Sequence, residues 1–258
     1  MPTPRRLLTQ NGELRPLGIY NWTLPAWVAR TSDGTAVNVC PAAGACVKFC
    51  YARNGTYNFP AVKAAHTRNL ELVLNDLNAF TTQMLNELTA RRFRPRGTPT
   101  LPDLSRDHLH PRVAALLDEG AVAVRVHDSG DFFSDEYLLA WLTIAQLTPG
   151  VLFFAYTKEV ARFRRVAADV APPNFLWVYS LGGREDDLLD LDVDRHADVF
   201  PDEVAVEAAG YYSQDEHDLL AVVAPSHRIG IPANNIPHFN KALAGRTFGE
   251  VEAELTRH

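Results

Sequence analysis

The strongest constraint on the fold is a repeated alternation of short apolar runs with segments of helical pattern. Three of these runs, residues 121–126, 151–156 and 175–179, are apolar almost throughout and have the length of buried strands. Strands that lack a polar face are typical of a parallel sheet covered on both sides. Helical segments between such strands indicate successive strand–helix units. The sequence therefore predicts an α/β fold.

The remaining elements extend this pattern along the chain. Further strands are predicted over residues 35–40, 204–206, 219–223 and 228–231. Helices are predicted over residues 61–92, 111–119, 135–147, 159–168 and 248–257. About six strands, counted from residue 35, indicate an open or partial (β/α)6-type barrel. We expect this barrel to be a single domain over residues 35–258, preceded by an irregular N-terminal arm over residues 1–34.

Composition narrows the class of protein. The chain has 258 residues and is 47% hydrophobic, which is enough for one sizeable core. It contains no apolar run of transmembrane length, and its basic N-terminus lacks the apolar segment of a signal peptide. We therefore expect a cytoplasmic protein. The net charge of −6 argues against binding of long duplex DNA, though not against recognition of one nucleotide in a pocket.

The chain has three cysteines, and all of them fall within eleven residues. Cys40, Cys46 and Cys50 have the spacing C-x5-C-x3-C. Thiolates are soft ligands that suit iron–sulfur clusters or zinc. Structural zinc usually takes four protein ligands, for which His66 could supply the fourth, and three free thiols are a further alternative. Three thiolates fit a [4Fe–4S] cluster that keeps one iron open to an outside ligand, because electron-transfer clusters usually take four cysteines.

Polar residues follow several predicted strands at the point where each strand ends. Cys40 ends the first predicted strand, residues 127–131 follow the second, Thr157 and Lys158 the third, and Ser180 the fourth. The carboxyl ends of parallel strands meet at one edge of a sheet. We therefore expect these side chains to share one rim with the cysteines.

At these residues the chain resembles known families. The cysteine loop, with Phe49 directly before Cys50, resembles the radical S-adenosylmethionine (SAM) superfamily, although the usual pattern there is C-x3-C-x-aromatic-C. Residues 40–52, 126–134 and 154–158 resemble more specifically the phage "gene product 88" family and related phage radical-SAM-like proteins. The resemblance covers residues 37–180.

The resemblance implies roles for particular residues. Ser129, Gly130 and Asp131 are similar to the Gly-Gly-Glu motif, whose carbonyls and carboxylate hold the methionine ammonium of SAM. It also implies that Lys158 holds the cofactor carboxylate and that Ser180 contacts the ribose. Phe49 and Tyr51 would pack beside the adenine and the cluster.

Each of these residues also has a structural alternative. Asp131 or Ser134 could cap the helix that begins at residue 135. Lys158 could pair with Glu159, Ser180 could be a turn residue, and both aromatic side chains could be structural. His127 is either a buried, hydrogen-bonded residue or a ligand contact. Residues 227–228 and 232–235, near the last strand, could contact adenine or substrate.

The resemblance implies an enzyme in which the cluster's open iron binds SAM and an electron donor such as flavodoxin or ferredoxin reduces the cluster. Cleavage of SAM would yield a 5′-deoxyadenosyl radical that abstracts hydrogen from an unidentified small-molecule or nucleotide substrate. A phage protein of this kind would act in the host cytoplasm. The alternatives are a non-catalytic iron–sulfur redox or host-interaction protein with a decayed SAM site, and a zinc-stabilised binding module.

Overall fold

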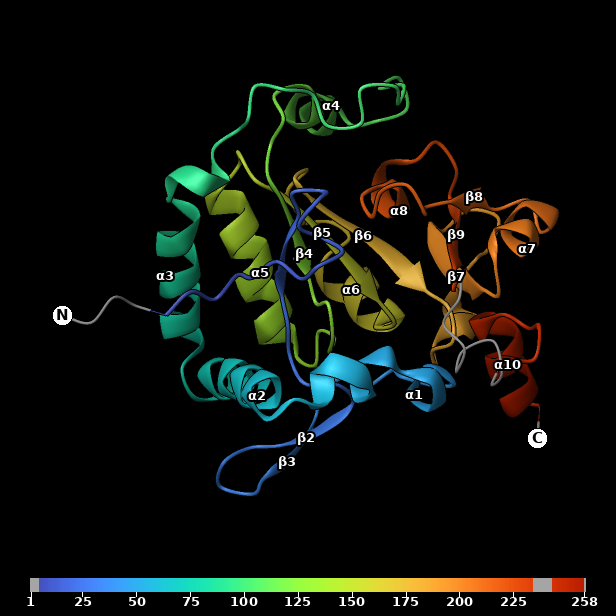
Figure 1. Ribbon diagram of the computed structural model, residues 1–258, viewed down its shortest axis with the longest axis horizontal. Helices are drawn as coiled ribbons and strands as arrows, with labels where there is room; N and C mark the ends of the chain where they lie inside the picture. The colour runs from blue at the N-terminus through green and yellow to red at the C-terminus, as the bar shows by residue number, and fades with distance from the viewer. Residues whose placement is uncertain (1–4, 234–242, 258) are drawn as a thin grey trace.

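A seven-stranded sheet forms the centre of the computed structural model, which describes residues 5–233 and 243–257 (Figure 1). Its strands are β1 Tyr20–Trp22, β4 Ala123–Val126, β5 Leu152–Thr157, β6 Phe175–Ser180, β7 His196–Phe200, β8 Tyr212–Ser213 and β9 Arg228–Pro232. They lie in the order β1-β4-β5-β6-β7-β9-β8, and every neighbouring pair is parallel. Among the described strands, β1 pairs only with β4 and β8 only with β9. The sheet is therefore open, and the fold is mixed α/β.

Helices cover both faces of this sheet. They are α1 Cys46–Phe49, α2 Pro60–Asn75, α3 Leu77–Leu88, α4 Pro111–Asp118, α5 Asp135–Leu147, α6 Val160–Val166, α7 Glu203–Ala208, α8 Leu220–Val223 and α10 Phe248–Leu255. Short 3-10 turns lie at Tyr51–Arg53, Gly55–Asn58, Arg91–Phe93 and Asp186–Leu188. Within the described ranges, no helix combines the length and apolar character needed to cross a membrane.

The two sheet faces belong to separate hydrophobic cores, which explains why the strand sequences are apolar throughout. Phe153 and Ala155 of β5 face the core formed with α3, α5 and α6. Their neighbour Phe154 faces the opposite core, to which α4 and α8 contribute. Successive strand residues point to opposite faces, so burial on both sides requires apolar residues at nearly every position.

The first strand of the sheet lies in the segment that we expected to be an irregular arm. Tyr20–Trp22 pairs in parallel with β4 and buries Trp22 completely. The predicted strand over residues 35–40 was misplaced, because Ala36–Asn38 (β3) instead pairs antiparallel with Val28–Arg30 (β2) in a separate two-stranded sheet. A three-residue strand with a polar centre, Asn21, is too short to give a readable pattern.

Three other predicted elements were wrong. The single helix over residues 61–92 is divided into α2 and α3 at Asp76, whose carboxylate accepts a hydrogen bond from the Ala79 amide at 2.8 Å and caps α3. The predicted strands at 204–206 and 219–223 are the helices α7 and α8. Short apolar runs do not distinguish a strand from a buried helical turn.

The other predictions of local structure fared better. The helices α4, α5, α6 and α10 and the strands β4, β5, β6 and β9 lie where the sequence predicts them. Strands β7 and β8 were missed. Two polar residues, His196 and Asp198, interrupt β7, and β8 has only two residues.

The burial of β1 gives a test of the fold. Replacing Trp22 by alanine should lower the free energy of unfolding by about 3–5 kcal/mol, because its ring is fully buried and its Nε1 donates to the Tyr137 hydroxyl at 2.7 Å. Trp27, which is 37% exposed, is the matched control, and Trp27→Ala should cost less than about 1 kcal/mol. Chemical denaturation measures both values. Equal losses would contradict the assignment of β1 to the core.

Candidate functional site

The cysteine loop lies over the carboxyl ends of β4, β5 and β6 and is fastened there by its backbone. Val39, just before the loop, accepts a hydrogen bond from the Asp131 amide at 2.9 Å, after β4. Ala42 accepts one from the Arg184 amide at 2.8 Å, and the Cys46 amide donates to the Gly182 carbonyl at 3.2 Å, both after β6. The loop therefore lies at the strand ends, although the strand that precedes it, β3, is not part of the parallel sheet as was predicted.

Two buried carboxylates hold the underside of this loop. Glu159, directly after β5, accepts a hydrogen bond from the Ala42 amide at 2.7 Å. Glu252 of α10 accepts one from the Ala45 amide. Burial, followed by the nearby charge of Asp131, raises the pKa of Glu159 to about 7. Sequence reasoning missed both tethers; the position of Glu159 after a strand was the only available signal.

Gly44 explains how the loop can approach Glu252 so closely. A Cβ atom at this position would clash with the Glu252 carboxylate, so any larger residue would force that side chain to shift. Gly44 is not among the residues with positive φ. The constraint here is space rather than backbone conformation.

The three thiols share one electrostatic environment. Burial raises the pKa of each thiol. The charges of Asp131, Cys46 and Cys50 raise the pKa of Cys40 further, whereas the Lys158 ammonium acts on Cys46 in the opposite direction. All three cysteines are free and partly buried. Their mutual influence indicates that they lie near one another and near the rim residues Asp131 and Lys158.

Asp131 joins the ends of two strands. Its carboxylate accepts hydrogen bonds from the Phe132 amide and the Thr157 hydroxyl, both at 2.8 Å, and from the Lys158 amide at 2.9 Å. It does not cap the following helix, because Ser134 takes that role by accepting from the Tyr137 amide at 3.2 Å. Asp131 therefore fixes the loop after β4 against the end of β5.

Gly130 and Ser129 complete the motif. Gly130 has φ +87°, and a Cβ there would lie 2.7 Å from the Leu24 Cβ. The Ser129 carbonyl accepts a hydrogen bond from the Leu24 amide at 3.0 Å. The Ser129 hydroxyl is buried and has no partner among the described residues. It is therefore a polar group available to a ligand.

Lys158 and Ser180 contact each other. The Lys158 ammonium donates to the Ser180 carbonyl at 2.7 Å, to the Ser180 hydroxyl at 3.0 Å and to the Leu181 carbonyl at 2.6 Å. The alternative pairing of Lys158 with Glu159 is absent from the described ion pairs, where Glu159 instead meets Arg162 at 3.2 Å. In this state Lys158 holds the end of β6.

The two aromatic candidates lie in different surroundings. Phe49 is buried against Phe248, with ring centroids 5.5 Å apart, and packs as part of a small hydrophobic core. Tyr51 is 39% exposed, and its hydroxyl donates to the Asp128 carbonyl. Tyr57 donates to the Asp128 carboxylate at 2.8 Å. Tyr51 thus links the cysteine loop to the end of β4.

A polar cluster on the neighbouring sheet face was also missed from the sequence. Arg125 of β4 pairs with Asp218 at 3.1 Å, and its guanidinium lies 4.7 Å from the ring centroid of Tyr156. The Tyr156 hydroxyl donates to Asp218 at 2.8 Å. In the sequence Arg125 and Tyr156 lie in apolar segments and Asp218 ends the polar run 213–218, and only the sheet brings them together.

His127 is buried and contacts aromatic side chains of the core. It has φ +71°, and its ring lies against Phe132, with Nε2 2.8 Å from the Tyr137 hydroxyl. Burial lowers its pKa to about 3. His127 is therefore a core residue in the described structure. Of the segments predicted near the last strand, residues 234 and 235 lie outside the described residues.

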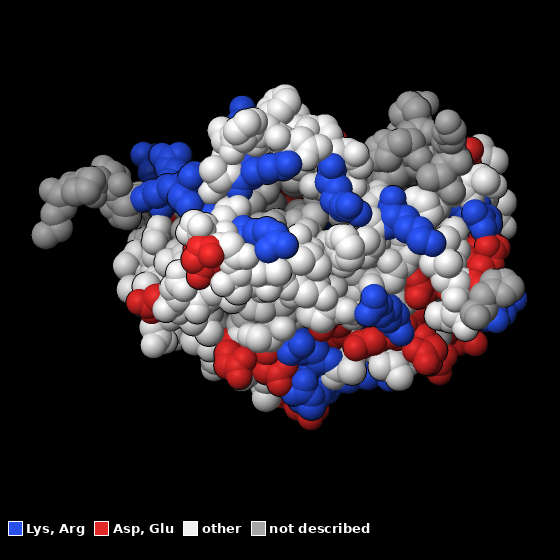
Figure 2. All heavy atoms as spheres, turned by 90° about the horizontal axis from the view of Figure 1, so that it is seen from below, with Lys and Arg blue, Asp and Glu red and all other residues white. Residues whose placement is uncertain are grey.

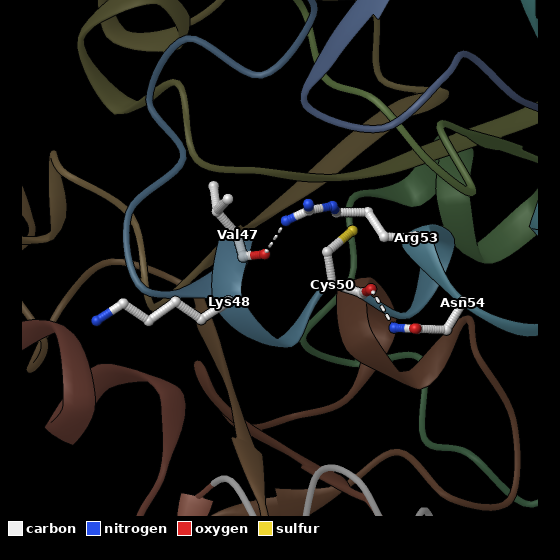
Figure 3. Close-up of a pocket in the computed structure, with 5 residues that line it drawn as sticks. All are labelled: Val47, Lys48, Cys50, Arg53 and Asn54. Atoms are coloured by element: carbon white, nitrogen blue, oxygen red, sulfur yellow. Dashed lines mark hydrogen bonds between the residues drawn. The ribbon is translucent and has the colours of Figure 1, made fainter.

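The cysteine loop also borders a small polar cavity (Figure 3). The cavity has a volume of about 240 Å³ and is lined by Val47, Lys48, Cys50, Arg53 and Asn54. The Arg53 guanidinium donates to the Val47 carbonyl at 3.1 Å, and the Lys48 side chain extends away from it. Cys50 thus lines a polar cavity that is also lined by the cations Lys48 and Arg53.

The donor set can be compared with what each metal requires. Across residues 5–233 and 243–257, no three His, Cys, Asp or Glu side chains are close enough to bind one metal ion. A single zinc ion needs its ligands within bonding distance of one centre. In a four-iron cluster each thiolate binds a different iron, so its ligands lie farther apart. The three thiols are soft donors of a kind that suits an iron–sulfur cluster or zinc.

The Glu252 tether predicts that α10 stabilises the cysteine loop. Glu252→Ala should lower the free energy of unfolding by about 1–3 kcal/mol, because it leaves the buried Ala45 amide without a partner. It should also accelerate alkylation of Cys46 in the metal-free protein. Glu254→Ala removes an exposed carboxylate from the same helix and should change neither quantity. Unchanged alkylation in Glu252→Ala would contradict the tether.

The buried His127 predicts a pH dependence of stability. Its folded-state pKa lies below the unfolded value near 6.5, so the unfolded chain binds the proton first and stability is lost as the pH falls from about 6.5 towards 3. Between pH 7 and pH 5 this loss should be about 2 kcal/mol. His127→Asn should flatten the slope, since asparagine tolerates positive φ. The exposed His110→Asn should leave the slope unchanged; identical slopes in all three proteins would refute the assignment.

Comparison with known proteins places this chain in a family. The profile of the family described as "Gene product 88" matches residues 4–254. The "Gene 88 protein" of Mycobacterium phage L5 is 30% identical over 120 residues, which is 46% of this chain and 42% of that protein. The chain thus aligns with less than half of that relative's length. No solved structure matches the chain. Because the family profile spans nearly all of the sequence, the chain belongs to the Gene product 88 family.

Proposed function

We propose that this chain binds a [4Fe–4S] cluster through Cys40, Cys46 and Cys50 and acts as a radical-SAM-like enzyme. One observation carries the proposal: the cysteine loop is fastened by backbone hydrogen bonds over the carboxyl ends of neighbouring parallel strands. In open α/β sheets this edge is where ligands bind. The proposal includes an electron donor of the flavodoxin or ferredoxin type and a location in the host cytoplasm.

The donor set supports a cluster with one iron not bound by cysteine. The chain supplies three thiols and no fourth cysteine. Bound there, such a cluster would supply the open iron for SAM and the electron that cleaves it to methionine and a 5′-deoxyadenosyl radical. The substrate that fits a phage protein of this kind is a small molecule or a nucleotide.

The protein controls metal affinity first through the protonation state of the three thiols. Because burial raises the pKa of all three, they are protonated in the metal-free protein at neutral pH. Metal binding must therefore release protons, and affinity should fall as the pH falls. The Lys158 ammonium offsets part of this cost at Cys46, since it lowers the pKa of that thiol.

The rim supplies the groups that would hold SAM. The unpartnered Ser129 hydroxyl can donate to or accept from a ligand. The Lys158 ammonium can hold a carboxylate only by exchanging its contacts with Ser180 and Leu181. Buried loop residues such as Ala43 and Ala45 would exclude water from the cluster side.

A specific observation favours a second candidate, a non-catalytic iron–sulfur redox or host-interaction protein. Asp131 makes all of its hydrogen bonds within the protein, to Phe132, Thr157 and Lys158. With the unusual C-x5-C-x3-C spacing, this is the arrangement expected where a SAM site has decayed around a retained cluster.

Anaerobic reconstitution with iron and sulfide tests the proposal. We expect about four irons and four sulfides per chain, a change in the electron paramagnetic resonance spectrum on addition of SAM, and formation of 5′-deoxyadenosine under reductant. Cys46→Ser should abolish iron binding. Ser129→Ala is the matched control, which should retain iron and weaken the response to SAM.

Each result separates the candidates. If a stable cluster assembles but SAM does not change its spectrum and no 5′-deoxyadenosine forms, only the non-catalytic candidate remains. Zinc without iron or sulfide in protein purified without oxygen would end both and support the zinc-stabilised module. Retention of the full iron content in Cys46→Ser would refute the assigned ligands.

A further inference from the structure

Positive charge is concentrated around the cysteine loop although the whole chain is acidic. Residues 34–70 contain four cations and no Asp or Glu, whereas the chain carries a net charge of −6. We name these four exposed cations the basic rim: Lys48 of α1, Arg53 of the following turn, and Lys63 and Arg68 of α2. Figure 2 looks at the face where α1 and α2 lie, and basic side chains surround a hollow there.

The cations of the basic rim are not neutralised within the described chain. No hydrogen bond or ion pair to a described residue is made by the side chains of Lys48, Lys63 and Arg68. The Arg53 guanidinium donates to the Val47 carbonyl and takes part in none of the described ion pairs. Solvated cations are common on protein surfaces. Here four of them lie in one segment beside a polar cavity at Cys50, and although Arg68 acts on the nearby carboxylate of Glu71, together they form a surface complementary to a polyanion.

Exposed aromatic side chains lie between these cations. Trp27 is 37% exposed, and the Arg53 guanidinium lies over its ring, 5.1 Å from the ring centroid. Phe59, at the start of α2, is 59% exposed. Trp27 also has φ +55°, a conformation that is uncommon for a bulky residue and that clusters at functional sites. The same face therefore offers cations for phosphates and ring faces for bases.

From this combination we propose that the basic rim binds single-stranded nucleic acid, with phosphates on the cations and bases stacked on Trp27 and Phe59. Single-strand sites combine a basic surface with exposed rings in this way. A duplex would hide its bases from the rings, and four charges on an acidic protein provide little affinity for it. Binding of a strand to the basic rim requires neither the cluster nor SAM. The inference rests on the proposed function only where it takes the bound strand to be the enzyme's substrate.

Fluorescence anisotropy of labelled twelve-nucleotide single strands, with the full chain in low salt, tests this inference. The triple variant Lys48→Gln, Lys63→Gln, Arg68→Gln removes unpartnered cations and should weaken binding at least about tenfold. It should also reduce the slope of log affinity against log salt by about 2, since each phosphate contact to a single strand contributes about 0.7. Trp27→Ala and Phe59→Ala should each weaken binding about tenfold.

The matched control is Arg15→Gln, Arg91→Gln, Arg94→Gln, which removes three exposed cations outside the basic rim. It should keep the affinity and the salt slope of the unaltered protein. Equal losses in both triple variants, equal affinity for a duplex of the same length, or no binding at all would overturn the inference. Preferential binding of an acidic protein over the oligonucleotides would also overturn it.

The two proposals fail separately. The binding measurement uses no iron, SAM or reductant, so it is unaffected if no cluster assembles. Conversely, the protein could form 5′-deoxyadenosine and yet bind no oligonucleotide. That result would support the proposed function and refute only the assignment of the basic rim as its substrate site.

Discussion

The arrangement of the site depends on one buried carboxylate, Asp131. Its amide holds Val39 at the start of the cysteine loop, and its oxygens accept hydrogen bonds from the end of β5. Burial raises the pKa of this carboxyl, and its hydrogen-bond donors act against that shift. A buried carboxylate without donors costs several kcal/mol. The carboxylate contacts therefore fix the loop after β4 against the end of β5, and the Asp131 amide, held in place by them, binds the Val39 carbonyl just before the cysteine loop.

The cysteine loop separates two electrostatic environments. Its inner side meets the acids Asp131, Glu159 and Glu252, and its outer side carries Lys48 and Arg53. Glu159 and Glu252 act as hydrogen-bond acceptors for loop amides, so removing either leaves a backbone donor unsatisfied. Of the outer cations, Arg53 donates to the Val47 carbonyl, whereas the Lys48 side chain makes no hydrogen bond with a described residue. This division explains why the loop can be rigidly held and still present charge to a ligand.

The parts of the fold that the sequence predicted are those with long, unambiguous patterns. β4, β5 and β6 are apolar on both faces, and α5 has a full helical period, so each is found where expected. β1 was missed because three residues carry no period, although Trp22 is among the most deeply buried side chains. The runs at 204–206 and 219–223 became helices because tertiary packing, rather than local composition, decides the state of so short an apolar segment.

The site was predictable to the extent that topology alone places it. Parallel strands bring their carboxyl ends together, so Asp131, Lys158 and Ser180 could be assigned to one edge from strand positions. Cys40 was assigned to the same edge from a strand that belongs to a separate sheet. The contacts of their side chains could not be assigned, because Lys158 has equally suitable partners in Ser180, Glu159 or a ligand. Glu252 gave no signal, since it lies 207 residues from the Ala45 amide that it holds. That contact exists only with α10 docked on the loop, so the local sequence around the cysteines carries no trace of it.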